Sequence, residues 1–526
     1  MSTRFPTSGA TVRPPVEGAA VDKGLKSGAI GLLSSIVLGV SSTAPAYALA
    51  ATLGFVVIAV GVKAPAIMLL AFIPMWLIAV AYSELNKREP DCGTTFTWAA
   101  RAFGPRAGWM GGWGIIAADV IVMANLAQVA GSYGYRLAGL DGLAGSTLWT
   151  TVAGVGWIAV MTWVCYRGIQ VSARMQYVLL SVEVVVLVAF AVYALVKVYA
   201  GTAPAGSLTP SLSWLWPSGL SWSSLTEATL LAIFIYWGWD SALAVNEETT
   251  DPARAPGRAA ITSTVLLVVI YTVVSVATVA FAGTGTAGIG LGNEANAEDV
   301  FSALGAAVFG DDVVGRVFEA LLIVSVLTSS AACTQTTILP TARGTLSMAA
   351  FRALPASFAR ITPRYLTPSV STIWMGIVSI AFYVGLTIVS ENVLQDSIVA
   401  TGMLIAFYYG LTGFACAWQF RRELRTPRDL LVRGVLPLLG GVFMLVVFVL
   451  ACIEYADPAY GSTVLFGVGG VFVVGVGALL LGVALMLAWN AVAPAYFRGE
   501  TLRPGTGVDT VVLTDDTAAG CRSLSR

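Results

Sequence analysis

Histidine is absent from this sequence: none of its 526 residues is a histidine. That absence excludes histidine metal ligands, Ser-His catalytic pairs and histidine proton relays. Charge is also scarce, since Asp, Glu, Lys and Arg make up 11% of the chain, against roughly 25% in an average soluble domain. The net charge is zero and no long basic or acidic run occurs. We therefore expect no nucleic-acid partner, no metal centre and no cofactor.

Cysteine is sparse, with six residues scattered along the chain. Four of them fall inside apolar segments, where a small buried hydrophobe is expected rather than a disulfide: Cys165, Cys333, Cys416 and Cys452. The polar N-terminal stretch has no basic start joined to a short apolar run and a small-residue cleavage site. We expect no removable signal peptide, and cysteine usage indicates no redox compartment.

Apolar residues dominate what is present. They make up 57% of the chain, and the mean hydropathy is +0.81. A helix that crosses a bilayer needs about 20 mainly apolar residues. The sequence predicts an all-α polytopic membrane protein with about twelve transmembrane helices. The candidate spans are 29–55, 64–84, 109–132, 148–166, 175–198, 224–246, 258–282, 314–341, 368–389, 396–418, 431–453 and 462–488.

The basic residues predict an orientation for these spans. Of the 29 Lys and Arg residues, 25 fall in alternate loops, and Lys and Arg favour the cytoplasmic side of a membrane. We expect a multi-pass protein of the cytoplasmic membrane with both termini inside. The predicted parts are a disordered N-terminal segment, 1–27; a transporter core, 28–420; two additional helices, 421–490; and a disordered tail, 491–526.

Two of the predicted spans are interrupted near their middles. The first carries Gly39, Val40, Ser41, Ser42, Thr43 and Pro45, and the sixth carries Gly238 and Asp240 among aromatic residues. Paired interruptions in two halves of a chain are typical of transporters built from inverted repeats, here about 28–200 and 224–420. Exposed half-helix ends offer N–H donors and free carbonyls to a ligand. Alternatively, the small residues serve close helix packing.

A signature lies between the second and third spans, in PDCGTTFTWAARAFGPRAGWMGGWG. It resembles that of the amino acid–polyamine–organocation (APC) superfamily, at Pro90, Cys92, Gly93, Phe96, Trp98, Phe103, Gly104, Pro105, Gly108, Trp109, Gly112 and Trp113. The first span and the block FIYWGWDSALAVNEETTDP resemble that family too, so the resemblance covers about residues 25–490. It implies a leucine-transporter-like (LeuT-like) 5+5 inverted repeat plus two C-terminal helices.

The resemblance also implies where a substrate binds. Backbone groups of Val40–Thr43 would hold a substrate carboxylate, carbonyls near Phe234–Gly238 would hold an amine, and Phe234 would close over the substrate. Asp119 falls where family members line the pocket; it would receive a cationic group or, alternatively, bond a neighbouring helix. The predicted substrate-binding residues are Gly39, Val40, Ser41, Ser42, Thr43, Asp119, Phe234, Ile235, Tyr236, Trp237 and Gly238.

Glu183 is the one ionisable residue in the middle of the fifth span, where many proton-coupled relatives carry a lysine. The reversed sign excludes transfer of the lysine mechanism, so Glu183 is a candidate proton carrier or cation ligand, or a structural hydrogen-bonding group. Asp240 is a second coupling candidate. By resemblance, Thr328 and Ser329 are a candidate cation site, although such hydroxyls often bond their own helix instead.

Together these features predict a permease that moves amino acids by alternating access, through proton-coupled symport or exchange. The coupling ion would be H⁺ or Na⁺, and the other partners are the substrate and membrane lipid. The alternative is a polyamine or cationic amino acid transporter or antiporter. A membrane-embedded enzyme or sensor is a remote alternative, because no nucleophile motif or group of metal ligands is evident.

Overall fold

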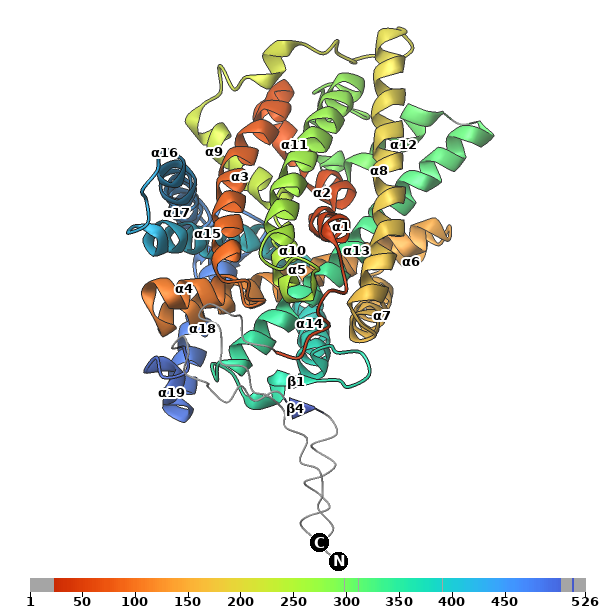
Figure 1. The fold of residues 1–526 in the computed structure, drawn as a ribbon. Helices are drawn as coiled ribbons and strands as arrows, with labels where there is room; N and C mark the ends of the chain where they lie inside the picture. Colours follow the sequence, from red (N-terminus) through yellow and green to blue (C-terminus); the bar gives the residue numbers. More distant parts are fainter. Residues whose placement is uncertain (1–22, 298, 311, 390, 503–512, 515–526) are drawn as a thin grey trace, which may run out of the picture.

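The computed structural model describes residues 23–502, apart from 298, 311 and 390, together with 513–514 (Figure 1). Most of this part of the chain is helical. Strands occur as two short pairs: β1 (Arg360–Ile361) runs parallel to β4 (Leu513–Thr514), and β2 (Val464–Leu465) runs antiparallel to β3 (Val468–Gly469). Ten helical stretches in the described residues are long and apolar enough to cross a membrane. The predicted all-α polytopic membrane fold is confirmed.

The count of twelve helices and the inverted repeat remain predictions. The first of the ten stretches, Leu32–Arg88, has 57 residues and contains three helices. These are α1 (Leu32–Ser42), α2 (Pro45–Val60) and α3 (Ala64–Arg88). By contrast, α9 (Trp222–Ile235) has 14 residues, which is too short to span a bilayer alone.

The remaining helices follow in chain order. The long ones are α5 (Pro105–Leu137), α7 (Thr147–Tyr166), α8 (Ile169–Tyr199), α11 (Ala255–Ala282), α13 (Val313–Ala350), α14 (Ser369–Val389), α15 (Glu391–Phe420), α17 (Leu436–Glu454) and α18 (Gly470–Val492). The short ones are α4 (Thr95–Phe103), α6 (Asp141–Ala144), α10 (Ser241–Ala244), α12 (Val300–Phe309), α16 (Pro427–Asp429) and α19 (Pro494–Phe497). Single turns are η1 (Gly61–Lys63), η2 (Leu212–Leu215), η3 (Asn246–Glu248), η4 (Glu294–Asn296) and η5 (Ala356–Ala359), with a π-helical turn at η6 (Leu430–Val435).

The helix α13 runs through the middle of the bundle. It packs against α5 and α8, and it also contacts α1 and α2. Its central residues, from Ser329 to Leu339, are all buried and rich in Ser and Thr. Polar groups facing hydrocarbon are costly, so this helix is placed where other helices, not lipid, surround it. In Figure 1, α11 lies beside α3 and next to α1, which completes the wall around the first interruption.

Both ends of the described chain lie at the same end of the bundle. The Nζ atom of Lys23 lies 5.8 Å from the ring centroid of Phe351, and Phe351 contacts Phe96 at 6.1 Å between ring centroids. Tyr496 of α19 stacks on Phe96 at 5.6 Å. An even number of crossings would place the two ends in this way. Which side of the membrane they occupy remains a prediction.

The structure describes part of each segment that the sequence predicted to be disordered. Residues 23–27 and 491–502 are placed in the structure, and the side chains of Lys23 and Tyr496 are fully buried. Tyr496, in the predicted tail, packs on Phe96, and the polar composition of the tail did not indicate this contact. Residues 1–22, 503–512 and 515–526, the rest of the two predicted segments apart from the β4 pair, lie outside the described residues.

Candidate functional site: two interrupted helices

The first interruption separates α1 from α2. The helix α1 ends at Ser42, Thr43 caps it, and Ala44 has a φ of 46°, in the left-handed region. Pro45 then begins α2, where its missing N–H costs no hydrogen bond. The residue before a proline is disfavoured in the α-helical region, which explains why the break falls at Ala44.

Gly39 is not at the break, contrary to the position that the sequence suggested. The helix α1 runs through Gly39 and ends three residues later. A Cβ at Gly39 would lie 2.7 Å from the hydroxyl oxygen of Ser263 and 3.3 Å from the carbonyl oxygen of Trp239. Gly39 therefore permits a close approach of α1 to α11 and to the second interruption. This is the alternative role, close helix packing, that the sequence left open for these small residues.

The second interruption lies between α9 and α10. The helix α9 ends at Ile235 and α10 begins at Ser241, so five residues separate them. Gly238, in the middle of this turn, has a φ of 119°, which an L-residue rarely adopts. The predicted break at Gly238 is present.

The two interruptions contact each other. A Cβ on Gly238 would lie 2.5 Å from the carbonyl oxygen of Ser42, so only glycine fits there. The hydroxyl oxygens of Ser42 and Ser241 are 2.7 Å apart, within hydrogen-bonding distance. From α13, the thiol of Cys333 donates to the carbonyl oxygen of Ser42 at 3.1 Å. Segments about two hundred residues apart in sequence thus share one site.

A small cavity lies at this junction. Its free volume of about 10 Å³ is about what one water molecule needs, so this conformation is closed around the cavity. Five predicted residues line it, and five lining residues were not predicted. The predicted ones are Ser42, Asp119, Trp237, Gly238 and Asp240, and the others are Ile115, Ser241, Thr337, Pro340 and Tyr408.

Two carboxylates face this cavity, one from α5 and one from the turn between α9 and α10. Asp119 of α5 accepts a hydrogen bond from the hydroxyl of Thr341 on α13. Asp240 accepts one from the hydroxyl of Tyr409 at 2.9 Å, and a longer one from Tyr408 at 3.4 Å. Both acids are therefore positioned by neutral hydroxyl donors, and none of the ten lining residues is Lys or Arg.

Glu183 belongs to α8, and its side chain contacts the start of α2. It is not among the residues that line the cavity. Its Oε1 atom accepts hydrogen bonds from the backbone N–H of Ala46 at 2.7 Å and from the hydroxyl of Ser329 at 2.8 Å. The N–H of Tyr47 in turn donates to the hydroxyl oxygen of Ser329 at 3.2 Å. The side chain of Glu183 is fully buried, and its Oε2 atom has no hydrogen-bond partner among the described residues.

The structure separates the two residues predicted to form a cation site. Ser329 joins Glu183, whereas the hydroxyl of Thr328 donates to the carbonyl oxygen of Ser325 in its own helix at 3.1 Å. That is the alternative considered for such hydroxyls.

Several predicted substrate-binding residues do not line the cavity: Gly39, Val40, Ser41, Thr43, Phe234, Ile235 and Tyr236. Several of them already have hydrogen-bond partners. The carbonyl oxygen of Ile235 accepts from the hydroxyl of Tyr271 at 2.7 Å, and the hydroxyl of Tyr236 donates to the carbonyl oxygen of Met68 at 3.0 Å. The ring of Phe234 lies 6.4 Å from that of Trp237, between centroids, and so borders the site indirectly.

The residues that sequence reasoning missed come mainly from α15 and α13. Tyr408 and Tyr409 are adjacent tyrosines within an apolar span, and a buried tyrosine hydroxyl usually requires a partner. That pair is a signal that could have indicated a polar site. Thr337 carried no such signal, because α13 is rich in hydroxyl residues along much of its length.

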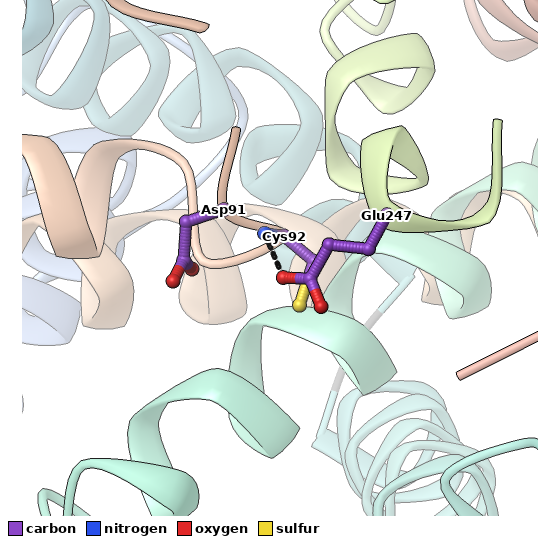
Figure 2. A group of neighbouring side chains, drawn as sticks. All are labelled: Asp91, Cys92 and Glu247. Carbon is purple, nitrogen blue, oxygen red and sulfur yellow. Dashed lines mark hydrogen bonds between the residues drawn. The ribbon is translucent and has the colours of Figure 1, made fainter. Parts of the chain in front are cut away.

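A second group of charges lies near the ends of the described chain. Figure 2 shows Asp91, Cys92 and Glu247, with the backbone N–H of Cys92 donating to Glu247 at 2.9 Å. One oxygen or sulfur atom from each lies within 4.8 Å of the others, an arrangement that could hold a metal ion. The Nζ atom of Lys23, however, lies 2.9 Å from Asp91 and 2.6 Å from Glu247, so an ammonium group already supplies the positive charge.

The pair of Lys23 and Asp91, called here the lysine pair, is stabilised in its ionised form, whereas burial raises the pKa of Glu247. Burial lowers the pKa of Lys23, but attraction to Asp91, Cys92 and Glu247 outweighs it and holds that pKa well above its usual value. Burial raises the pKa of Asp91, but Lys23 outweighs it and leaves that pKa lowered.

A second buried pair adjoins it, between Arg343 of α13 and Glu248 of η3. The backbone N–H groups of Ala29 and Ile30 also donate to the carbonyl oxygen of Glu248, at 2.8 and 3.1 Å. Asp91 accepts a hydrogen bond from the hydroxyl of Ser347 on α13 at 2.8 Å. These bonds fasten the chain before α1 and the chain after α10 to α13 at this end of the bundle.

Comparison with known proteins shows that most of the chain matches the model of one protein family. The model of the amino acid permease family matches residues 30–494. An uncharacterised transporter of Mycobacterium tuberculosis is 26% identical over 479 residues, which is 90% of this chain and 95% of the relative. The vacuolar cationic amino acid transporter 4 of Arabidopsis thaliana is 26% identical over 63% of this chain and 53% of its own length. A branched-chain amino acid permease of Lactococcus lactis is 25% identical over 39% of this chain and 46% of the permease.

Proposed function

Because this chain belongs to the amino acid permease family, we propose that it moves an amino acid or a related amine across the cytoplasmic membrane by alternating access. The substrate occupies the cavity between the two interruptions, which widens in other conformations. Five residues of the cavity lie in or directly beside the interruptions, and they support this placement: Ser42, Trp237, Gly238, Asp240 and Ser241. Such junctions of discontinuous helices are where many secondary transporters bind their substrates.

The contact that carries the proposal is the hydrogen bond from Ala46 to Glu183. The helix α2 begins directly after the first interruption, so its free N–H groups and positive dipole end meet the Glu183 carboxylate. Glu183 belongs to α8, and its other partner, Ser329, belongs to α13. One carboxylate thus ties the hinge of the first interrupted helix to two helices that surround it.

We assign Glu183 the role of coupling residue, with H⁺ as the coupling ion. Its Oε2 atom is buried without a hydrogen-bond partner among the described residues, and a proton bound there would be shielded from water. Protonation would remove the negative charge that faces the start of α2 and so weaken its bond to Ala46. The hinge could then move, which links proton binding to the change of conformation.

The test is transport by purified protein in lipid vesicles. Glu183→Gln keeps the shape but cannot cycle between charged and neutral forms. We expect proton-driven accumulation to fall to the level set by simple equilibration, while counterflow of the substrate is kept. Glu227→Gln, a change to an exposed acid on α9, is the matched control and should leave accumulation intact.

A second variant tests the same role if Glu183→Gln folds poorly. Ser329→Ala removes the hydroxyl shared by Glu183 and Tyr47, and we expect a severalfold loss of accumulation at unchanged counterflow. Thr328→Ala, whose hydroxyl bonds its own helix, should have no such effect. Normal uphill uptake by Glu183→Gln would remove this residue from the mechanism, and a requirement for Na⁺ would replace the proton as coupling ion.

The orientation is also part of the proposal. We place both termini in the cytoplasm, because most basic residues fall in the loops on the side of the chain ends. The packing of Lys23 and Tyr496 at one end of the bundle supports a shared side. The lysine pair and the Arg343–Glu248 pair would then close the cytoplasmic end in this conformation.

A further inference from the structure

The two carboxylates that face the cavity require compensation. Asp119 is on α5 and Asp240 is in the turn between α9 and α10, and the cavity has no lining Lys or Arg. A charge inside a membrane protein is costly unless it is paired, and two like charges in one cavity disfavour each other's ionised form. Their positive partner therefore comes from outside the chain, as protons or as the substrate itself.

The surroundings of the two acids favour a substrate partner. Each acid is held by hydroxyl donors on a different helix: Thr341 for Asp119 and Tyr409 for Asp240. Hydroxyls that donate to a carboxylate favour its ionised form, whereas burial disfavours that form, so the ionised acids need a cation in the cavity. Neither acid bonds to the other in the structure, whereas two carboxyls that share a proton are normally bonded to each other.

The rest of the lining suits an organic cation. The aromatic side chains of Trp237 and Tyr408 border the cavity, and aromatic faces attract alkylammonium and guanidinium groups. Trp237 donates its indole N–H to the hydroxyl of Tyr408, so the two rings are held together as one wall. Ile115 and Pro340 offer apolar surface to an alkyl chain.

We propose that the substrate carries two positively charged nitrogens joined by an alkyl chain, one for Asp119 and one for Asp240. This inference rests on the proposed function and specifies its substrate. The shared chemistry has two sources, a dibasic amino acid such as lysine and a diamine such as cadaverine. Two acids and two cationic nitrogens would leave the closed cavity without net charge.

Counterflow in vesicles tests this with three labelled compounds. Lysine and cadaverine each carry two cationic nitrogens, and they differ in the carboxylate; leucine carries one cationic nitrogen and a carboxylate. We expect counterflow of lysine, of cadaverine or of both, and little of leucine. The pair of dications then tells whether the carboxylate is recognised.

Isosteric variants assign the recognition to the two acids. Asp119→Asn and Asp240→Asn should each raise the half-saturating concentration of the preferred dication at least tenfold. The same changes should reduce the preference for dication over leucine, which a merely structural role would not do. Glu227→Gln, the same acid-to-amide change at an exposed residue of α9 that does not line the cavity, is the matched control and should alter neither quantity.

The outcomes are distinguishable. Counterflow of leucine alone, or unchanged dication affinity in both Asn variants, would overturn the inference and leave the proposed function standing. Absence of counterflow for every amino acid and amine tried would contradict the proposed function as well.

Discussion

The two interruptions differ in length and in partners. Two residues separate α1 from α2, and the first N–H groups of α2 are already bonded to Glu183 and Ser329. Five residues separate α9 from α10, and this longer turn presents Asp240 to the cavity. In the proposed mechanism, the first interruption is a hinge that the protein's own carboxylate holds, and the second is the surface that meets the substrate.

The largest effect should come from Gly238→Ala. An added Cβ would lie 2.5 Å from the Ser42 carbonyl oxygen at a backbone φ of 119°, so the two interruptions could not meet as they do. We expect counterflow to be abolished. Gly402→Ala, at a helical glycine with no heavy atom within 4 Å of the added Cβ, should transport normally. Wild-type counterflow in Gly238→Ala would contradict the contact.

A smaller effect is expected from Lys23→Met. This variant tests the contacts that join the chain before α1 to the chain after α10. Loss of the ammonium leaves Asp91 buried without its cation, a change that typically costs about 3–5 kcal/mol. We expect a lower unfolding temperature and faster labelling of the buried Cys92 thiol by a maleimide. The double variant Lys23→Met, Asp91→Asn should recover part of the stability.

The pH dependence of this loss follows from the two pKa shifts. The raised pKa of Lys23 means that its contribution is present below the usual lysine pKa and is lost only in stronger base. The lowered pKa of Asp91 means that its contribution is lost only in acid. The stability difference between wild type and the double variant Lys23→Met, Asp91→Asn, which lacks both groups, should therefore be constant from about pH 6 to about pH 9. A difference that vanished within this range would show that the pair is not ionised as described.

The sequence was sufficient to predict the fold class and to locate both interruptions. Apolar spans, Pro45, and Gly238 beside Asp240 are local signals, because each acts through its own backbone or its own cost in lipid. Gly39 shows the limit of prediction from such local signals. A glycine that allows close packing and a glycine that ends a helix look alike until the neighbour, here Trp239, is known.

The partners of the site could not be predicted in the same way. Glu183 was identified by its charge, but its bond to Ala46 joins positions 137 residues apart, and no local pattern encodes that distance. Lys23 was counted only as a basic residue of a disordered segment, although it is buried between two acids. Long-range pairing of charges depends on the packing of whole helices, which the sequence alone did not provide.

Disulfide cross-linking between the two interruptions tests the central claim most directly. In the double variant Ser42→Cys, Ser241→Cys, the two sulfurs replace hydroxyl oxygens that are 2.7 Å apart. We predict that a mild oxidant joins the two sulfurs and stops counterflow, and that a reductant restores counterflow. The oxidant should not change counterflow by either single variant. Undiminished transport after oxidation, with both thiols still free to react, would show that the interruptions do not meet.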